Sequence, residues 1–183
     1  MAAERTSLVT AVVLLLGCAA PPTTGLQVVV APHSAAAPAW LADPSVGDRA
    51  RTTSEIVVAA WHAPARRLDG YTLTLEAGAG TLDCGGAPAT GCTTVAGGGG
   101  GTIVVQVASA ACLEVTVLAH ELGHVALAGD TGHQDARWYS ADLGRQVAQA
   151  LLPTVPAKDG PCLAKLRELE ASVVYMISWG NGV

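Results

Sequence analysis

The stretch HELGHVALAGDTGH, residues 120–133, limits the folds open to this chain more than any other feature. Its first two histidines, His120 and His124, are four residues apart, and side chains at this spacing share one face only on an α-helix. Neutral imidazoles on one face can bind a single metal ion. We therefore expect a helix here, followed by a turn that brings a further ligand back to the same place.

The residues around this stretch predict an α+β fold with the motif on a central helix. TIVVQVA at 102–108 has the alternation of a strand, and the apolar residues after it recur at helical spacing. Ser109 is the expected N-cap of that helix, and Gly129 the left-handed residue that ends it. The other expected elements are strands at 26–31 and 71–77 and helices at about 53–62, from Ser140, and from Asp159 to about Trp179.

The first 18 residues resemble a bacterial export signal. The apolar run from Leu8 to Gly17 is too short to span a bilayer, and it ends in LLGC, which resembles a lipobox with Cys18 as the lipidated residue. Ordinary cleavage near Ala19 or Ala20 is the alternative. We expect an exported cell-envelope lipoprotein that touches the membrane only through its lipid anchor, or otherwise a secreted protein. Residues 19–45 are then a tether with a first strand in it, and 46–183 the folded domain.

The remaining four cysteines suit an oxidising compartment, and three pairings are open. We favour Cys84 with Cys92, which closes a short loop, and Cys112 with Cys162, which ties the central helix to the last one. No CxxC pair supports a thiolate metal site. The net charge of −5 provides no basic stripe, so we expect no nucleic-acid partner. We also expect a monomer.

The segment AHELGHVALAG resembles the active-site helix of the zincin metallopeptidases, and more narrowly the metzincin and matrixin-like group. The resemblance covers about 102–133. It implies a small mixed sheet with a backing helix and a central active-site helix, and a peptide or protein substrate lying along a strand edge such as 102–108. It also implies one Zn²⁺ held by His120 and His124, with Glu121 activating the zinc-bound water that hydrolyses a peptide bond.

The third ligand is where this chain departs from the family pattern HExxHxxGxxH. Leu127 occupies the glycine position and Asp130 the position of the third ligand. Either Asp130 binds the ion, or the helix turns at Gly129 and the following loop presents His133. We favour His133, because imidazole is the commoner ligand. Asp130 would then orient a ligand histidine.

Two further interpretations remain open. Tyr139 can donate a hydrogen bond to the oxyanion of a peptidase reaction, although a packed aromatic is the favoured interpretation. The alternatives to a peptidase are a catalytically inactive metal-binding protein and a structural envelope lipoprotein without metal.

Overall fold

The computed structural model describes residues 25–32, 38–78, 80–109, 112–172 and 175. The predicted export signal and Cys18 lie outside these residues, as does the predicted helical segment 176–179. In the part of the chain that the structure describes, no helix combines the length and apolarity needed to cross a membrane.

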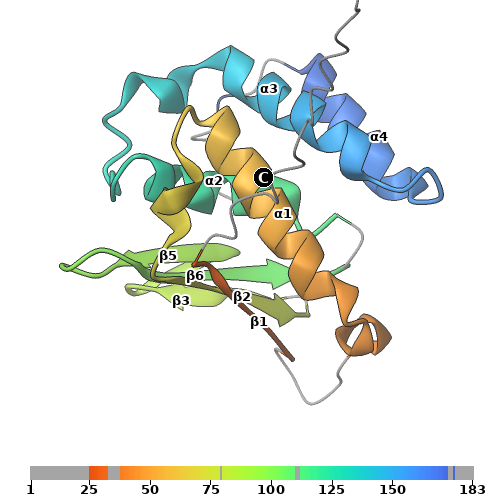
Figure 1. The fold of residues 1–183 in the computed structure, drawn as a ribbon, viewed down its shortest axis with the longest axis horizontal. Coiled ribbons are helices and arrows are strands. Elements are labelled where there is room, and N and C mark those ends of the chain that lie inside the picture. The colour runs from red at the N-terminus through yellow and green to blue at the C-terminus, as the bar shows by residue number, and fades with distance from the viewer. Residues whose placement is uncertain (1–24, 33–37, 79, 110–111, 173–174, 176–183) are drawn as a thin grey trace, which may run out of the picture.

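A four-stranded mixed sheet forms the base of the molecule (Figure 1). Its strands, in spatial order, are β1 (Gln27–Pro32), β2 (Tyr71–Ala77), β6 (Gly101–Val107) and β5 (Gly91–Val95). The first three run parallel, and β5 runs antiparallel to β6. A separate hairpin of β3 (Leu82–Cys84) and β4 (Ala87–Ala89) lies beside β5.

The four α-helices of the described residues lie on one side of this sheet (Figure 1). The first layer holds α1 (Ser45–Ala60) and α2 (Val115–Ala126), and the outer layer holds α3 (Ala141–Leu151) and α4 (Gly160–Ala171). Short 3-10 helices connect them: η1 (Ala39–Ala42), η2 (Ala65–Leu68), η3 (Ala136–Tyr139) and η4 (Leu152–Thr154). The predicted α+β class, with a small mixed sheet and a central helix, is confirmed.

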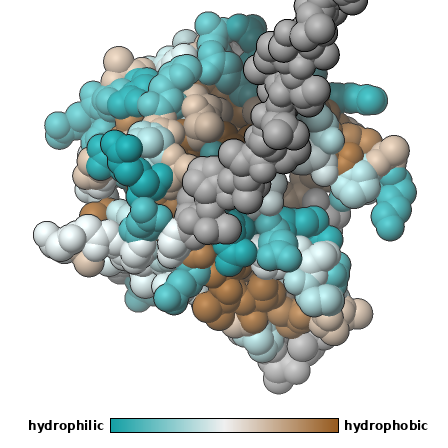
Figure 2. Space-filling view, in the orientation of Figure 1, coloured by the Kyte–Doolittle hydropathy of each residue, from teal (hydrophilic) through white to brown (hydrophobic). Residues whose placement is uncertain are grey.

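The edge strand β1 exposes apolar surface. Figure 2 shows a hydrophobic area at the lower part of the molecule, where Figure 1 places β1, and Val29 of this strand is 46% exposed. Although the sequence analysis assigned β1 to the tether, the strand pairs along its length with β2 and therefore belongs to the sheet.

Strands were predicted correctly where apolar and polar residues alternate along the chain, and they were missed where no such alternation occurs. The strand at 71–77 is confirmed, and those at 26–31 and 102–108 are each displaced by one residue. The three strands β3, β4 and β5 were not predicted. They are only three to five residues long, too short for an alternation of apolar and polar residues to mark them.

The observed ends of the helices differ from the predicted ends more than those of the strands do. The helix predicted from 53 begins at Ser45, where Asp43 accepts a hydrogen bond from the Ser45 N–H. The central helix begins at Val115 rather than just after Ser109. Leu113 is buried but has a left-handed backbone (φ 49°), so it extends the apolar pattern without extending the helix. The last helix ends at Ala171, far short of Trp179.

The turn at the end of α2 forms one residue earlier than predicted. Ala128, with φ of 57°, donates its N–H to the Val125 carbonyl, and Gly129 donates to the His124 carbonyl. This pair of bonds is the Schellman arrangement, with an alanine in the left-handed position that glycine normally fills. Gly129 also has positive φ (87°), so the chain reverses sharply here.

The two disulfides are those favoured by the sequence. Cys84 bonds to Cys92, joining β3 to β5, and Cys112 bonds to Cys162, joining the residues before α2 to α4. Two disulfides are consistent with an extracellular protein, because they persist in oxidising compartments.

Two tryptophans fill the space beneath α2. Trp61 and Trp138 are fully buried and meet edge to face, with ring centroids 4.7 Å apart. They reach the helix backbone at Gly123, where an added Cβ would lie 2.4 Å from Trp61 and 2.6 Å from Trp138. The helix therefore requires glycine at its centre, despite the low helix propensity of this residue.

Gly123→Ala tests this close packing. Alanine gains about 1 kcal/mol of helix propensity, but overpacking against two rigid rings costs about 1–3 kcal/mol, so we expect net destabilisation. Gly47→Ala in α1 is the matched control, because its Cβ would meet nothing within 4 Å and should stabilise the fold slightly. Urea unfolding of both variants gives the comparison. Equal effects at the two positions would contradict the packing argument.

Candidate metal centre

Three histidines converge at the C-terminal half of α2. His120 and His124 lie on the helix, and His133 comes from the loop that follows it. One ring nitrogen of each lies within 4.8 Å of the others, a group that could hold a metal ion. His120 and His124 are buried, and His133 is partly buried. The structure thus brings together the three residues favoured as ligands.

The distance between two of the ring nitrogens fits a shared ion. Nε2 of His133 lies 3.2 Å from Nε2 of His120. Ligand nitrogens around a tetrahedral ion with metal–nitrogen bonds of about 2.0–2.1 Å lie about 3.3–3.4 Å apart. The loop therefore holds His133 at ligand spacing from the helix.

The tautomer of His124 is set by the loop. Its Nδ1 lies 2.9 Å from the backbone oxygen of Asp130, to which the Nδ1–H donates a hydrogen bond. The lone pair on Nε2 is then available to an ion, which is the usual arrangement for a metal-binding histidine. Burial, the largest cause, lowers the pKa of both His124 and His133, and this favours the neutral form that binds metals.

Asp130 supports the loop with its carboxylate instead of joining the three histidines. The two oxygens accept hydrogen bonds from the backbone N–H of Gln134 (3.1 Å) and of Asp135 (2.8 Å), and from Nε1 of Trp138 (3.0 Å). These bonds lower the pKa of the Asp130 carboxyl and keep it ionised. Asp130 was expected to orient a ligand histidine, and it does so through its backbone oxygen, which accepts the hydrogen bond from His124.

An ion pair within the loop, and a hydrogen bond from it to the C-cap residue of α1, hold the loop in place. Arg137 donates from Nε and Nη2 to the two carboxylate oxygens of Asp135, and from Nη1 to the backbone oxygen of Trp61. These bonds to Arg137 lower the pKa of Asp135 to about 2. Because His133 has a left-handed backbone (φ 53°), such anchors are needed to hold it in place.

Trp138 is the residue of this site that the sequence analysis missed. Its ring centroid lies 5.0 Å from that of His120, 4.9 Å from His124 and 4.5 Å from His133. It is fully buried and so forms the apolar floor beneath all three imidazoles. The only signal in the sequence was a large aromatic five residues after His133.

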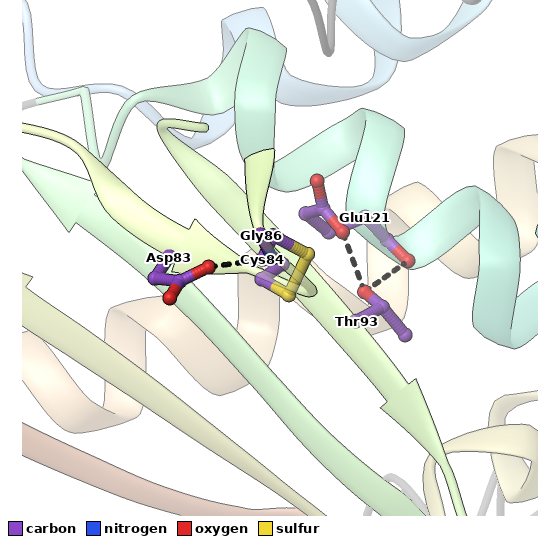
Figure 3. The surroundings of a disulfide bond; sticks show 6 residues. Asp83, Cys84, Gly86, Thr93 and Glu121 are labelled. Carbon is purple, nitrogen blue, oxygen red and sulfur yellow. Dashed lines mark hydrogen bonds between the residues drawn. A yellow bond between two sulfur atoms is a disulfide. The ribbon is translucent and has the colours of Figure 1, made fainter. Parts of the chain in front are cut away.

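Glu121 lies next to the histidines and is bonded to the sheet. Its Oε2 accepts a hydrogen bond of 2.7 Å from the hydroxyl of Thr93 on β5, which Figure 3 shows beside the Cys84–Cys92 disulfide. The residue is 5% exposed, and burial raises its pKa to about 7 despite the opposing effect of the Thr93 hydrogen bond. A carboxyl group with such a pKa can exchange protons near neutral pH.

A cleft of about 690 Å³ opens beside these groups. Its walls include the three histidines, Glu121, strand β5 and the β3–β4 hairpin. Tyr139 is not among the described lining residues, and it is 54% exposed. The packed-aromatic interpretation of Tyr139 was wrong, because its neighbour Trp138 takes the buried position in η3, and the oxyanion role stays a prediction.

The strand beside the cleft is also not the one expected. The strand at 102–108, here β6, pairs with β2 on one side and β5 on the other, so it offers no free edge. The sheet ends instead at β5, and β5 packs against α2.

Comparison with known proteins adds no relative. No model of a known protein family matches the chain, and neither curated proteins nor solved structures give a match. The site is therefore interpreted from its own geometry.

Ion binding should depend on His133 more than on Asp130. Titration of the metal-free protein with Zn²⁺ as the probe ion should give one site per chain. Loss of a ligand in His133→Ala should nearly abolish binding, whereas loss of a supporting carboxylate in Asp130→Ala should weaken it about 10–100-fold. His62→Ala, which changes an exposed histidine at the end of α1, is the control. Binding that survives without His133 but not without Asp130 would contradict this geometry.

The metal-free protein should also show the raised pKa of Glu121 in its stability. Since the folded state raises this pKa from 4.5 to about 7, the contribution to stability is complete below pH 4.5 and is lost as pH rises to about 7. The difference in unfolding free energy between the parent and Glu121→Gln should therefore fall by up to about 3 kcal/mol across that window. The histidines titrate in both proteins and cancel. Urea unfolding in a chelator at several pH values measures the difference, and a constant value would refute the shift.

Proposed function

We propose that this protein is a zinc-dependent metallopeptidase. The observation that carries the proposal is the placement of Glu121 in the same cleft as the three converging histidines. An ion-storage site has no need of a carboxyl group held beside its ligands in this way. A hydrolase needs both a Lewis acid and a proton acceptor.

Zinc is the metal that this ligand set fits best. Three neutral imidazoles suit Zn²⁺, and a set of three protein ligands is typical of catalytic rather than structural zinc sites. Bound there, zinc would polarise a scissile carbonyl and make a water molecule more acidic. His120, His124 and His133 would hold it, with His124 oriented by the Asp130 carbonyl.

In this proposal Glu121 moves the protons. Its carboxylate would accept a proton from the attacking water and later deliver one to the departing amine. Its side chain lines the same cleft as the three histidines, within the space where an ion-bound water would lie. Trp138 beneath the histidines would keep bulk water away from that side.

The substrate would be a peptide or protein in extended conformation. β5 is an edge strand beside the cleft, and strand edges pair with extended peptides through backbone hydrogen bonds. The hairpin side of the cleft presents small residues, including Ala87, Pro88 and Ala89. We propose that these residues contact the substrate side chains.

We further propose that the protein acts outside the cytoplasm. The N-terminal apolar run and the LLGC sequence at Cys18 support an envelope lipoprotein, and cleavage without lipidation would yield a secreted enzyme. The paired cysteines of the folded part are compatible with either location.

Glu121→Gln is the decisive variant. It should retain one zinc per chain, because the histidines are intact, and should lower the rate of peptide hydrolysis about 10²–10⁴-fold. Cleavage of a fluorogenic peptide library and metal analysis of the same preparation provide the two readouts. Glu168→Gln, an exposed glutamate on α4, is the matched control and should behave as the parent does.

Three outcomes are informative. Zinc without hydrolysis in the parent would favour the metal-binding alternative, and no metal at all would favour the structural lipoprotein. Hydrolysis that survives in Glu121→Gln would refute the role of this residue as the proton carrier.

A further inference from the structure

Two residues of β5 meet the Glu121 side chain from the same direction. Gly91 and Thr93 are two positions apart on the strand, so both face α2, while Cys92 between them faces the other way. The Thr93 hydroxyl donates to Oε2 of Glu121 at 2.7 Å. A Cβ on Gly91 would lie 2.8 Å from both Cγ and Oε1 of Glu121. Oε1 of Glu121 thus lies against the backbone of Gly91, and Oε2 is hydrogen-bonded to Thr93.

We propose that Gly91 and Thr93 are positioning residues that fix the orientation of the Glu121 carboxyl group for catalysis. The inference rests on the proposed peptidase function, and it assigns to β5 a role in the enzyme's own chemistry. Gly91 admits the side chain, since any larger residue would displace it. Thr93 selects one of the rotamers that remain.

The hydroxyl of Thr93 is itself well placed for this task. It lies 3.2 Å from the backbone oxygen of Glu121, so it contacts both the main chain and the carboxyl group of the same residue. A glutamate side chain has three rotatable bonds, and small errors in the position of a reacting group are costly in rate. A short contact from a rigid β-branched residue removes most of that freedom.

The strand that carries these residues is held on two sides. Gly91 pairs with Val105 of β6 and Thr93 with Ile103. On the face turned away from α2, Cys92 is bonded to Cys84 of the β3–β4 hairpin (Figure 3). The disulfide therefore anchors β5 at the residue between the two that touch Glu121.

Close packing alone offers a simpler reason for Gly91. An added Cβ there would also lie 2.5 Å from Cγ1 of Val117, so glycine is needed for α2 to approach β5 at all. Gly91→Ala can thus fail for structural reasons. Thr93 carries the test, because valine has the same shape as threonine and lacks only the hydroxyl group.

The experiment compares Thr93→Val and Thr93→Ser in the zinc-loaded full chain. We expect the valine variant to lose about tenfold or more in kcat with little change in KM or zinc content, as expected when a hydrogen bond to a charged group is lost. The serine variant, which keeps the hydroxyl, should recover most of that loss. Thr94→Val is the matched control, because Thr94 is exposed on the opposite face of β5.

A second readout does not need activity. In the metal-free protein, Thr93→Val is made in the parent and in a Glu121→Ala background, and the unfolding equilibrium constant is measured in each. The change caused by Thr93→Val should be about tenfold smaller in the Glu121→Ala background, because the hydrogen bond is already absent there. Additive effects of the two changes would overturn the contact between them.

The outcomes separate this inference from the proposed function. An active parent whose kcat is unaffected by Thr93→Val would overturn the positioning role and leave the peptidase intact. A loss in Thr93→Val that serine does not recover would also overturn it. A parent without hydrolysis would overturn the peptidase and with it the catalytic role, and the unfolding cycle would still decide whether Thr93 holds Glu121.

Discussion

The contact between the Trp138 indole and the three imidazoles is the interaction on which the rest of the site depends. The ring centroids of His120, His124 and His133 lie 4.5–5.0 Å from that of this buried indole, and its N–H donates to the carboxylate of Asp130. The same indole packs against Trp61, which belongs to the end of α1. The geometry of the ligands is therefore tied to the core through a single rigid side chain.

This arrangement explains how a core of small side chains can hold a defined site. The chain contains no Phe, and its Ala, Val and Gly residues give little stiffness of their own. The fully buried Trp61 and Trp138 provide large rigid surfaces, and the two rings meet at Gly123. Because glycine lets both rings touch the backbone of α2, the contact fixes how closely the helix packs against the two tryptophans.

The sequence predicted the parts of the site that depend on local spacing. His120 and His124 share a face because they are four apart, and the preference for His133 over Asp130 followed from ligand chemistry and a nearby glycine. Long-range contacts were beyond such reasoning. Thr93 is 28 residues from Glu121, and nothing local marks Thr93 as its partner. The left-handed Ala128 was also missed, since alanine rarely adopts that backbone.

The Cys112–Cys162 disulfide closes a ring of chain that contains α2 and the loop after it. All three histidines, Glu121, Asp130 and Trp138 lie inside that ring. The exposed residues Thr131 and Gly132 also lie inside it. A chain cut there by a protease remains one covalent molecule, with its parts still attached through the disulfide. Only a reductant would release the fragments.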